Sequence, residues 1–356
     1  MIIYSKSSGL NPASIGKLET PIKMIIEHEN EICKNEPAVY NTLFNMETSN
    51  HFGETIVNES DFNLFQRVGE GEAAVLDSVE QVGSKFIEHV QYMKEFIITA
   101  EMMEDSNYGI ASSAKRRAES FVRSYYKSMN LLCSKAFGNA RSASLTYLGT
   151  QLDLTTSDGL PLYSASHKWG TTNGAHGTQS NFFYGDIFSK GGEEERVYDI
   201  TLLEDALTKL SNQLRNMKDD NGNVLGYTPD TIVVPGNRPF TEAMIKKVCG
   251  SPNVVGSSNN DFNVHYGKWN VIVLPHWIVY EDTFIMMSSE ANRDLGGNMF
   301  FNRVPLTVTN WVDHHTGNYV WNGRCRFGIG FGSYKHALLA VDAPYEVEDC
   351  TNIASI

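Results

Sequence analysis

The sequence predicts an α+β protein in which long strands accompany one long amphipathic helix. Three patterns indicate this class: a helical period over residues 107–138, alternating apolar residues over 62–104, and a strand-rich final third. The chain has 356 residues, of which 41% are hydrophobic, so it can bury a sizeable core. This composition excludes a disordered chain, and the length is typical of two domains or one two-lobed unit.

The first 60 residues are polar and are interrupted by Pro12, Pro21 and Pro37. Only residues 22–32 have a helical pattern, and it is short. We therefore expect an extended N-terminal arm that becomes ordered mainly by lying on another surface.

The next segment, residues 62–104, has the pattern of strands broken by glycines. The run 85–99 alternates well enough for one long strand, and Gly83 precedes it. Two long strands around a turn at Gly83 would form a protruding hairpin. Such a hairpin is marginally stable alone in water, so we expect it to need a partner surface.

Residues 107–138 predict the longest helix, because apolar residues recur there at three- and four-residue steps and Gly138 ends the pattern. The opposite face is basic. Between residues 107 and 141, seven basic side chains stand against Glu119 alone, a net charge of +6. The basic residues are Lys115, Arg116, Arg117, Arg123, Lys127, Lys135 and Arg141. A solvated helix face is the ordinary interpretation of such a run.

The remaining chain alternates helices and strands. Thr201 and Glu204 have the spacing of a capping box, which predicts a helix from 201 to 217 with an apolar stripe of leucines. Pro239 opens another helix that reaches residue 248. The predicted strands are 231–234, 271–274, 284–287, 306–312, 319–331 and 337–341.

Net charge and cysteine content restrict the partners. The 42 acidic residues exceed the 29 basic ones by 13, so the overall field would repel nucleic acid. No run approaches the roughly 18 apolar residues of a membrane helix. The start of the chain lacks a signal-peptide pattern, so we expect a soluble intracellular product without a membrane partner. Five widely spaced cysteines without a C-x-x-C predict reduced thiols rather than disulfides or a zinc site.

The histidines and serines give no enzymatic signature. His167 and His176 lack a third ligand or an H-E-x-x-H helix, so we expect loop histidines that fix turns through hydrogen bonds. Ser164 and Ser166 lie beside His167 without a nucleophile elbow. We therefore predict no catalytic, metal or cofactor site. A hydrolase that uses His167 or His176 is kept as an alternative.

Two further motifs also have structural interpretations. His314 and His315 are adjacent and would face opposite sides of a strand, so a turn fits them better than a metal site. Gly328, Gly330 and Gly332 lie inside a strand pattern, without the helix that a dinucleotide-binding loop requires. They predict close backbone packing or a bend.

Several stretches, taken in order, carry a family resemblance. They are Phe96-Ile-Ile-Thr-Ala-Glu-Met-Met-Glu-Asp, Asp158-Gly-Leu-Pro-Leu-Tyr-Ser-Ala-Ser-His, the capped helix with Pro229-Asp-Thr-Ile-Val-Val-Pro-Gly-Asn-Arg, Gly267-Lys-Trp-Asn-Val-Ile-Val-Leu-Pro, and Arg324-Cys-Arg-Phe-Gly-Ile-Gly-Phe-Gly. With these motifs in this order, the chain resembles the major capsid proteins of tailed bacteriophages that have the Hong Kong ninety-seven type of fold.

The resemblance implies a domain layout. It comprises an N-arm at 1–60, an E-loop at 61–106, a P-domain at 107–198 with a spine helix at 107–138, an A-domain at 199–330, and a return to the P-domain at 331–356. It implies a non-enzymatic virion protein, assembled in the host cytoplasm without a cofactor. Its hexamers and pentamers would close an icosahedral shell around phage dsDNA without sequence-specific binding.

Other copies of the chain are the main partners that the resemblance implies. Because the sequence opens directly with its arm, we also expect a separate scaffolding protein, together with a portal and a possible decoration protein. An encapsulin-type cargo compartment of the same fold is the alternative.

Charge suggests how neighbouring subunits meet. Residues 61–106 hold ten acidic against three basic side chains, a net charge of −7, opposite the helix of +6. We expect the acidic E-loop of one subunit to lie over the basic helix of a neighbour; the candidate contacts are Glu70, Glu72, Asp77 and Glu80 with Arg116, Arg117, Arg123 and Lys127. Exposed pairs contribute only ~0–1 kcal/mol each, so the field would set register more than affinity.

This contact hypothesis has a test and a rival. Reversing Arg116, Arg117 and Arg123 to glutamate is expected to block assembly and to spare the fold of the monomer. In the rival interpretation the basic face contacts DNA or a scaffold.

Overall fold

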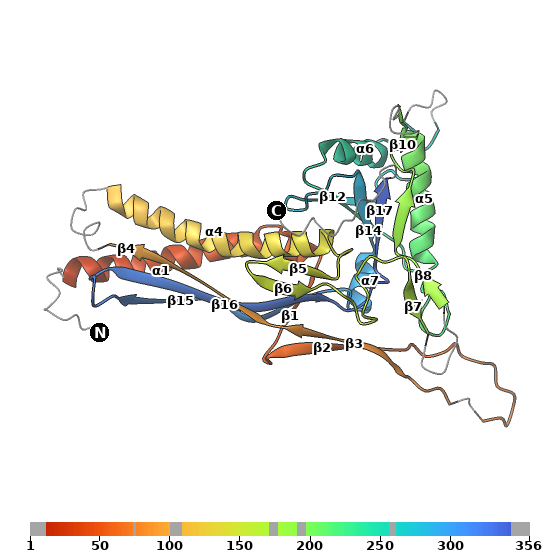
Figure 1. Ribbon diagram of the computed structural model, residues 1–356, viewed down its shortest axis with the longest axis horizontal. Helices are drawn as coiled ribbons and strands as arrows, with labels where there is room; N and C mark the ends of the chain where they lie inside the picture. Colours follow the sequence, from red (N-terminus) through yellow and green to blue (C-terminus); the bar gives the residue numbers. More distant parts are fainter. Residues whose placement is uncertain are drawn as a thin grey trace.

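The computed structural model describes residues 12–73, 76–99, 109–170, 177–190, 197–255 and 261–342. They form a long lobe, a second lobe at one end of it, and a projecting arm (Figure 1). Helices and sheets both contribute to the core, so the predicted α+β class is confirmed. Within the described residues, no helix is long and apolar enough to cross a bilayer.

The long lobe is a four-stranded sheet covered by two helices. Strands β1 (Asn45–Thr48), β15 (Asn298–Val312), β16 (Tyr319–Phe331) and β4 (Val90–Ile98) are neighbours in that order. Helices α1 (Pro12–Asn35) and α4 (Gly109–Gly138) lie side by side along the sheet (Figure 1). Ala118 and Phe121 of α4 pack against Trp321 of β16 and Ile22 of α1.

Helix α4 confirms the predicted long helix, whereas the expectation for the N-terminal region is wrong. Helix α1 has 24 residues, not the short stretch 22–32, and it packs on α4 of its own chain. Its buried side chains Ile22, Ile26, Glu29 and Cys33 fall on one narrow stripe. A narrow apolar stripe is enough to hold α1 in place, because it packs against a single helix. Glu29 within the stripe interrupts the apolar period, so the sequence pattern does not predict the full helix.

The second lobe is built on a five-stranded sheet. Its strands are β13 (Asn270–Leu274), β12 (Thr231–Pro235), β14 (Thr283–Met287), β17 (Ala337–Asp342) and β9 (Phe182–Gly185), adjacent in that order. The outer pairs are parallel, and β14 runs antiparallel to both of its neighbours. Helices α5 (Ile200–Arg215) and α6 (Pro239–Gly250) cover one face.

The opposite face of this sheet packs against the end of α4 and so joins the two lobes. Ile232 and Val234 point toward α5 and α6, whereas Val233 and Ile285 lie in the cluster that contains Phe137 of α4. Because both faces are covered, every residue of β12 and β14 is buried. Such strands read as continuous apolar runs, which explains why they were predictable.

Short elements complete the fold. They are α2 (Val39–Thr42), α7 (Ser289–Asp294), β5 (Ser144–Tyr147), β6 (Thr150–Asp153), β7 (His167–Trp169), β8 (Gly177–Gln179), β10 (Ser189–Lys190) and β11 (Val197–Tyr198). The pairing of strands does not follow the boundary expected at residue 330. Residues 298–331 belong to the sheet of the long lobe, and 337–342 return to the five-stranded sheet.

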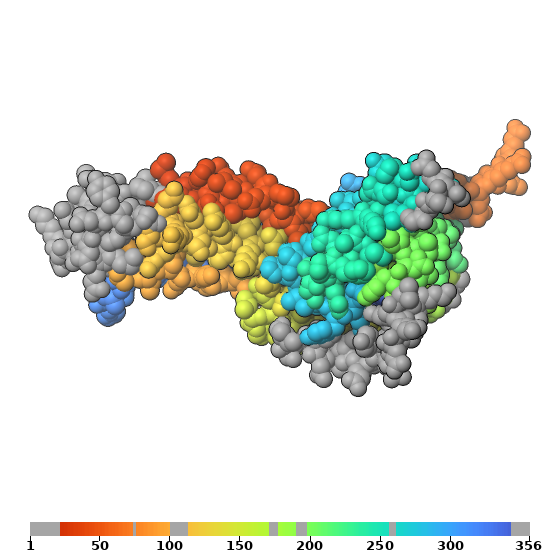
Figure 2. Space-filling view, turned by 90° about the horizontal axis from the view of Figure 1, so that it is seen from above, coloured from red at the N-terminus to blue at the C-terminus, as the bar shows by residue number. Residues whose placement is uncertain are grey.

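The arm consists of residues 53–73 and 76–88, with strand β2 (Gly53–Glu59) paired to β3 (Gln81–Glu88) and a tip formed by residues 60–73 and 76–80. The expected turn at Gly83 is wrong. Gly83 lies inside β3 opposite Asn58, and a Cβ there would approach Ser157 O to 2.6 Å. The single strand expected over 85–99 is also divided: β3 ends at Glu88, and β4 pairs with β16 instead. Figure 2 shows the arm projecting beyond the second lobe.

Two of the glycines predicted to allow close packing, Gly328 and Gly330, let strand β3 of the arm lie close against β16 of the long lobe. A Cβ at Gly328 would lie 2.7 Å from Glu88 O, and one at Gly330 would lie 2.5 Å from Cδ1 of Ile87. Close packing at these positions, where β3 crosses β16, is therefore confirmed.

The start of α5 corrects the predicted capping box. Asp199 is the N-cap, and its carboxylate accepts hydrogen bonds from the backbone N–H and the hydroxyl of Thr201 at 2.9 and 2.8 Å. The predicted stripe of Leu203, Leu207, Leu210, Leu214 and Met217 is buried, as expected. A carboxylate one residue before the helix makes the same capping bond as a hydroxyl, which explains the error of two residues.

Gly138 closes α4 against Trp277 and provides a stability test. A Cβ at this position would lie 2.3 Å from the indole ring, which is 1% exposed. We expect Gly138→Ala to lower the free energy of unfolding by about 1–3 kcal/mol through overpacking, measured by urea denaturation. Gly250→Ala is the control, because no atom lies within 4 Å of its Cβ position. Equal losses in the two variants would contradict the packing role.

His336 should make stability depend on pH. Its ring is 0% exposed, and burial lowers its pKa from 6.5 to about 4, while a hydrogen bond to the Ser333 carbonyl offsets only part of this effect. The unfolded chain binds this proton near pH 6.5 and the folded chain only near pH 4. This contribution is therefore complete above pH 6.5 and decreases as the pH falls, by about 3 kcal/mol at pH 4.

Urea unfolding at pH 7, 5.5 and 4.5 measures this slope. His336→Gln should remove most of the decrease between pH 6.5 and 4. If the free energy of unfolding of His336→Gln falls with pH as steeply as that of the unsubstituted chain, another titrating group causes the decrease.

Candidate subunit-contact surfaces

The predicted basic residues of α4 form one exposed strip. Arg116, Arg117, Arg123 and Lys127 are all exposed, and Lys94 of β4 lies beside them. Lys94 shares a hollow of about 430 Å³ with Arg116 and Arg117, and another of about 490 Å³ with Arg123 and Lys127. We call these five residues the basic strip. The sequence placed four of them correctly on one face, and the fifth joins through tertiary packing.

Arg123 has a second role that the sequence did not indicate. Its Nε lies 2.5 Å from Oε1 of Glu29, a residue of α1 that is 6% exposed. Arg123 therefore neutralises a buried carboxylate of its own chain and fastens α1 to α4. The expectation that reversing Arg123 would spare the fold is corrected for this reason. Arg117, in contrast, makes an exposed hydrogen bond to Ile97 O at 2.7 Å.

The candidate acidic residues of the arm divide into two pairs. Glu70 and Glu72 are exposed at the tip, where the Glu72 carboxylate accepts a hydrogen bond from Gly69 N at 3.0 Å. Asp77 accepts one from Asn63 N at 2.6 Å, and hydrogen bonds from Asn63 lower its pKa. Glu80 lies at the base of the tip, where its backbone pairs with Ser60. Glu70 and Glu72 are thus exposed toward a neighbour, although Glu72 also holds Gly69 N, whereas Asp77 and Glu80 order the tip itself.

The arm and the basic strip do not meet within one chain. The arm leaves the long lobe on the side of the sheet away from α4 (Figure 1). A contact between the two surfaces therefore requires two subunits. Glu101, Glu104 and Asp105, which contribute to the charge counted from the sequence, lie outside the described residues.

Large apolar side chains cover the arm tip without burial. Phe65 and Leu76 have exposed fractions of 108% and 96%, and Phe62 and Leu64 are also exposed. Several large apolar side chains exposed on one projecting segment are typical of a site of protein contact. The alternating pattern over 62–79 was detectable in the sequence, but it was interpreted there as a strand that needs a partner.

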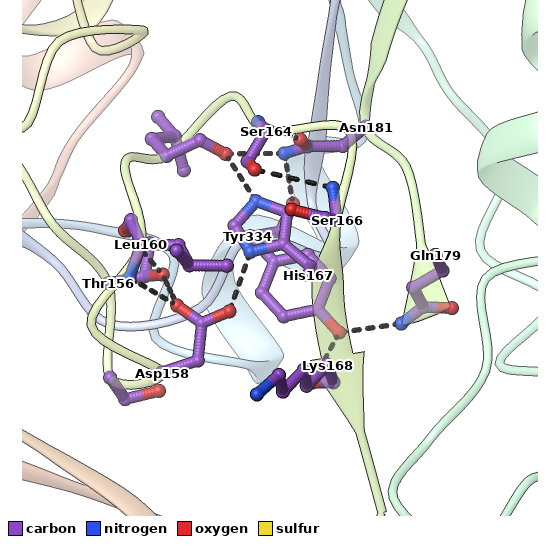
Figure 3. A network of polar contacts seen from close by, with 12 residues as sticks. Thr156, Asp158, Leu160, Ser164, Ser166, His167, Lys168, Gln179, Asn181 and Tyr334 are labelled. Atoms are coloured by element: carbon purple, nitrogen blue, oxygen red, sulfur yellow. Dashed lines mark hydrogen bonds and ion pairs between the residues drawn. The ribbon is translucent and has the colours of Figure 1, made fainter. Parts of the chain in front are cut away.

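His167 is the centre of a buried polar network (Figure 3). Its Nδ1 lies 2.6 Å from Oδ2 of Asp158, and its Nε2 lies 3.1 Å from Leu162 O. The ring stacks on Tyr334 with centroids 3.8 Å apart and planes inclined by 1°. Burial by itself would raise the pKa of Asp158, but hydrogen bonds from His167 and Thr156 outweigh burial and lower it. The network fixes the loop 154–166, so the expected turn-holding role is confirmed, although His167 itself begins strand β7 and does not lie in the loop.

The same network gives no support to the hydrolase alternative. His167 is 0% exposed, so no substrate can reach its ring. The Ser164 hydroxyl accepts a hydrogen bond from Ser166 N at 3.3 Å, and both ring nitrogens of His167 bond to other groups, Asp158 and Leu162 O. His176 lies outside the described residues. In the described part of the chain, no group of three or more His, Cys, Asp or Glu side chains is arranged to hold a metal ion.

The adjacent histidines lie in the turn that the sequence predicted. Asp313 accepts hydrogen bonds from His315 N at 3.1 Å and from the Thr316 hydroxyl at 2.7 Å, and Gly317 has a φ of 70°. This turn joins β15 to β16 at the end of the long lobe.

Comparison with known proteins identifies the architecture. No protein-family model and no curated protein matches the chain. The capsid of cyanophage P-SCSP1u is similar in structure, with a TM-score of 0.50 and 9% identity over 87% of this chain and 89% of that chain. The chain has the phage capsid fold.

Two further phage structures are also similar. The capsid of Myoviridae phage XM1 has a TM-score of 0.49 and 13% identity, with 87% of this chain and 94% of that chain covered. The procapsid of bacteriophage JBD30 has the same TM-score and identity over 95% of this chain and 78% of that chain. The similarity to the P-SCSP1u capsid, with its TM-score of 0.50, confirms the phage capsid fold that the order of motifs predicts.

Within the capsid fold, one apolar surface was missed by sequence analysis. A groove of about 360 Å³ lies between β4, α4 and the β5–β6 hairpin. We call it the tyrosine groove; its large side chains are Tyr92, Met93, Phe121, Tyr125, Tyr147 and Leu148. These residues come from three segments that are distant in sequence. No local sequence pattern predicts that the three segments lie together in the fold. The single local signal was Leu148-Gly149, an unusual pair for a tight hairpin turn.

Proposed function

We propose that the chain is a major capsid protein of a tailed bacteriophage, which assembles into hexamers and pentamers of an icosahedral shell around dsDNA. The phage capsid fold supports this function. The observation that carries it is the arm, because its tip exposes Phe65 and Leu76 almost completely and projects beyond the second lobe (Figure 2). An isolated subunit gains nothing from such an arm, whereas a neighbouring subunit would cover it.

The charge of the two surfaces supports a specific contact between neighbours. The arm tip carries Glu70 and Glu72, and the basic strip carries five cations on the other side of the sheet. In our proposal the arm of one subunit lies over the basic strip of the next. Because this contact joins two different surfaces, it propagates from subunit to subunit, and it forms the rings of a hexamer or pentamer when the rotation between subunits closes. The protein then acts as a structural component of the virion and not as an enzyme.

Electron microscopy of the expressed chain tests this function. The full chain is purified with and without a co-expressed scaffolding protein and is examined by negative stain. Closed shells or tubes are expected. Monomers at high concentration in both preparations would contradict the proposal. Shells that retain a cargo enzyme instead of DNA in infected cells would assign an encapsulin-type compartment.

A further inference from the structure

The tyrosine groove has the form of a receptor for one large apolar side chain. Tyr92, Tyr125 and Tyr147 line it, and Cys325 and Phe327 of β16 lie at its floor. Lys94 belongs to the lining of both the groove and the basic strip, so the apolar and cationic surfaces are continuous. The groove thus offers an apolar site flanked by positive charge.

Leu148 on the rim of the groove has an unfavourable conformation and environment. It has a φ of 47°, and it is the only non-glycine residue with positive φ in the described part of the chain. Its side chain is 78% exposed. A two-residue turn with positive φ at both positions favours asparagine before glycine, and leucine has no local advantage there. Strained residues of this kind accumulate at sites that bind something.

The arm tip of a second copy fits this receptor. Phe65 and Leu76 at the tip are almost fully exposed, and Glu70 and Glu72 are close to them in the chain. The tip therefore combines an aromatic anchor with negative charge, which is the complement of an apolar groove beside a basic strip. The arm of the same chain points away from the groove, so the anchor must come from another subunit (Figure 1).

We infer that Phe65 of one subunit inserts into the tyrosine groove of its neighbour, with Leu148 closing over it and Glu70 and Glu72 facing the basic strip. This inference rests on the proposed function and adds to it the residue that anchors the arm. Aromatic anchors that fill a pocket carry most of the energy of an interface, whereas the charges around them set orientation.

Substitutions at the two ends of the contact test the inference. Leu148→Asn supplies the residue that the turn prefers, so the melting temperature should not fall, yet the assembled fraction should drop about tenfold. Phe65→Asp should have the same effect, and Phe65→Leu should retain assembly. Val224→Asn is the matched control, because Val224 is another exposed apolar residue, at 56%, outside the groove. Normal assembly of both Leu148→Asn and Phe65→Asp would overturn the inference.

A cysteine pair distinguishes failure of this contact from failure of the proposed function. In a chain with Cys350→Ser, the pair Phe65→Cys and Leu148→Cys is treated with a short bismaleimide after assembly. Cys325 lines the groove, so it is also changed to serine; the other described native cysteines are buried and should not react. A ladder of linked subunits up to rings is expected, and the pair Phe65→Cys with Val224→Cys should give none. Shells without a ladder would overturn the inference alone, whereas an absence of shells from the unsubstituted chain would overturn both.

Discussion

Changing Arg116 and Arg117 to glutamate should prevent shell assembly and leave the melting temperature of the subunit nearly unchanged. Both side chains are exposed, and neither pairs with a buried carboxylate. The two reversals change the charge of residues 107–141 from +6 to +2 and place carboxylates where the proposal puts Glu70 and Glu72 of a neighbour. Loss of complementary charge slows encounter by factors of roughly 10–10³, and each shell requires many such encounters.

The assay counts particles by negative stain and sedimentation, with thermal unfolding of the subunit as the test of folding. Lys246→Glu with Lys247→Glu is the control, since it changes net charge equally on α6 of the second lobe. Shells of normal number from the Arg116 and Arg117 variant would refute the contact between the arm and the basic strip.

Arg123→Glu should behave differently from its two neighbours on the same face. It would place a carboxylate against Glu29, which is buried and has Arg123 as its cationic partner at 2.5 Å. Leaving a buried charge without its partner is strongly unfavourable, so α1 should detach from α4. We expect a lower melting temperature for Arg123→Glu alone, and its rescue by Glu29→Gln would confirm the cause.

His167→Ala should cause the largest loss of stability among the single substitutions considered. The change removes a ring that is 0% exposed and uncovers the face of Tyr334 stacked on it. It also leaves Asp158 without the partner that lies 2.6 Å away. The cavity, together with the loss of the donor to Asp158 Oδ2, costs about 3–5 kcal/mol. Asp158 Oδ1 keeps its hydrogen bonds from the Thr156 hydroxyl and Leu160 N. Urea denaturation at pH 7 measures the loss.

Two comparisons make the His167 prediction specific. His315→Ala removes an exposed histidine from a turn and should change stability by less than ~0.5 kcal/mol. Since the pKa of Asp158 is lowered in the folded chain, its contribution is complete above pH 3.8 and is lost as the pH falls through the folded value. His167→Ala should therefore flatten the decrease in stability below pH 4. If stability falls below pH 4 as steeply in His167→Ala as in the unsubstituted chain, the lowered pKa of Asp158 does not depend on His167.

Elements buried on a regular face were predictable from the sequence. The long helix α4, the apolar stripe of α5, the helix opened by Pro239 and strand β16 were all expected close to their observed bounds. Each has a sustained apolar period or a clear boundary residue. Helix α1 was not, because Glu29 lies within its buried stripe and is neutralised by Arg123 from a helix far along the chain.

The arm shows where local pattern fails. The sequence indicated that a projecting β element exists between residues 61 and 106, but it placed the turn at Gly83. That glycine is needed for close approach to Ser157, a contact that depends on tertiary structure. Four residues of the basic strip were found because they share helix α4, whereas Lys94 comes from β4 and was not. The tyrosine groove was missed because β4, α4 and the β5–β6 hairpin each supply only part of it.

The sheet of each lobe is built from several segments that are far apart in the sequence. The five-stranded sheet of the second lobe takes its strands from residues 182–185, 231–287 and 337–342. The four-stranded sheet of the long lobe takes its strands from residues 45–48, 90–98 and 298–331. A single recombination point therefore cannot exchange one intact lobe for a homologous one. Insertions that leave every sheet pairing intact are instead expected in peripheral segments such as residues 60–73, which lie outside the strands.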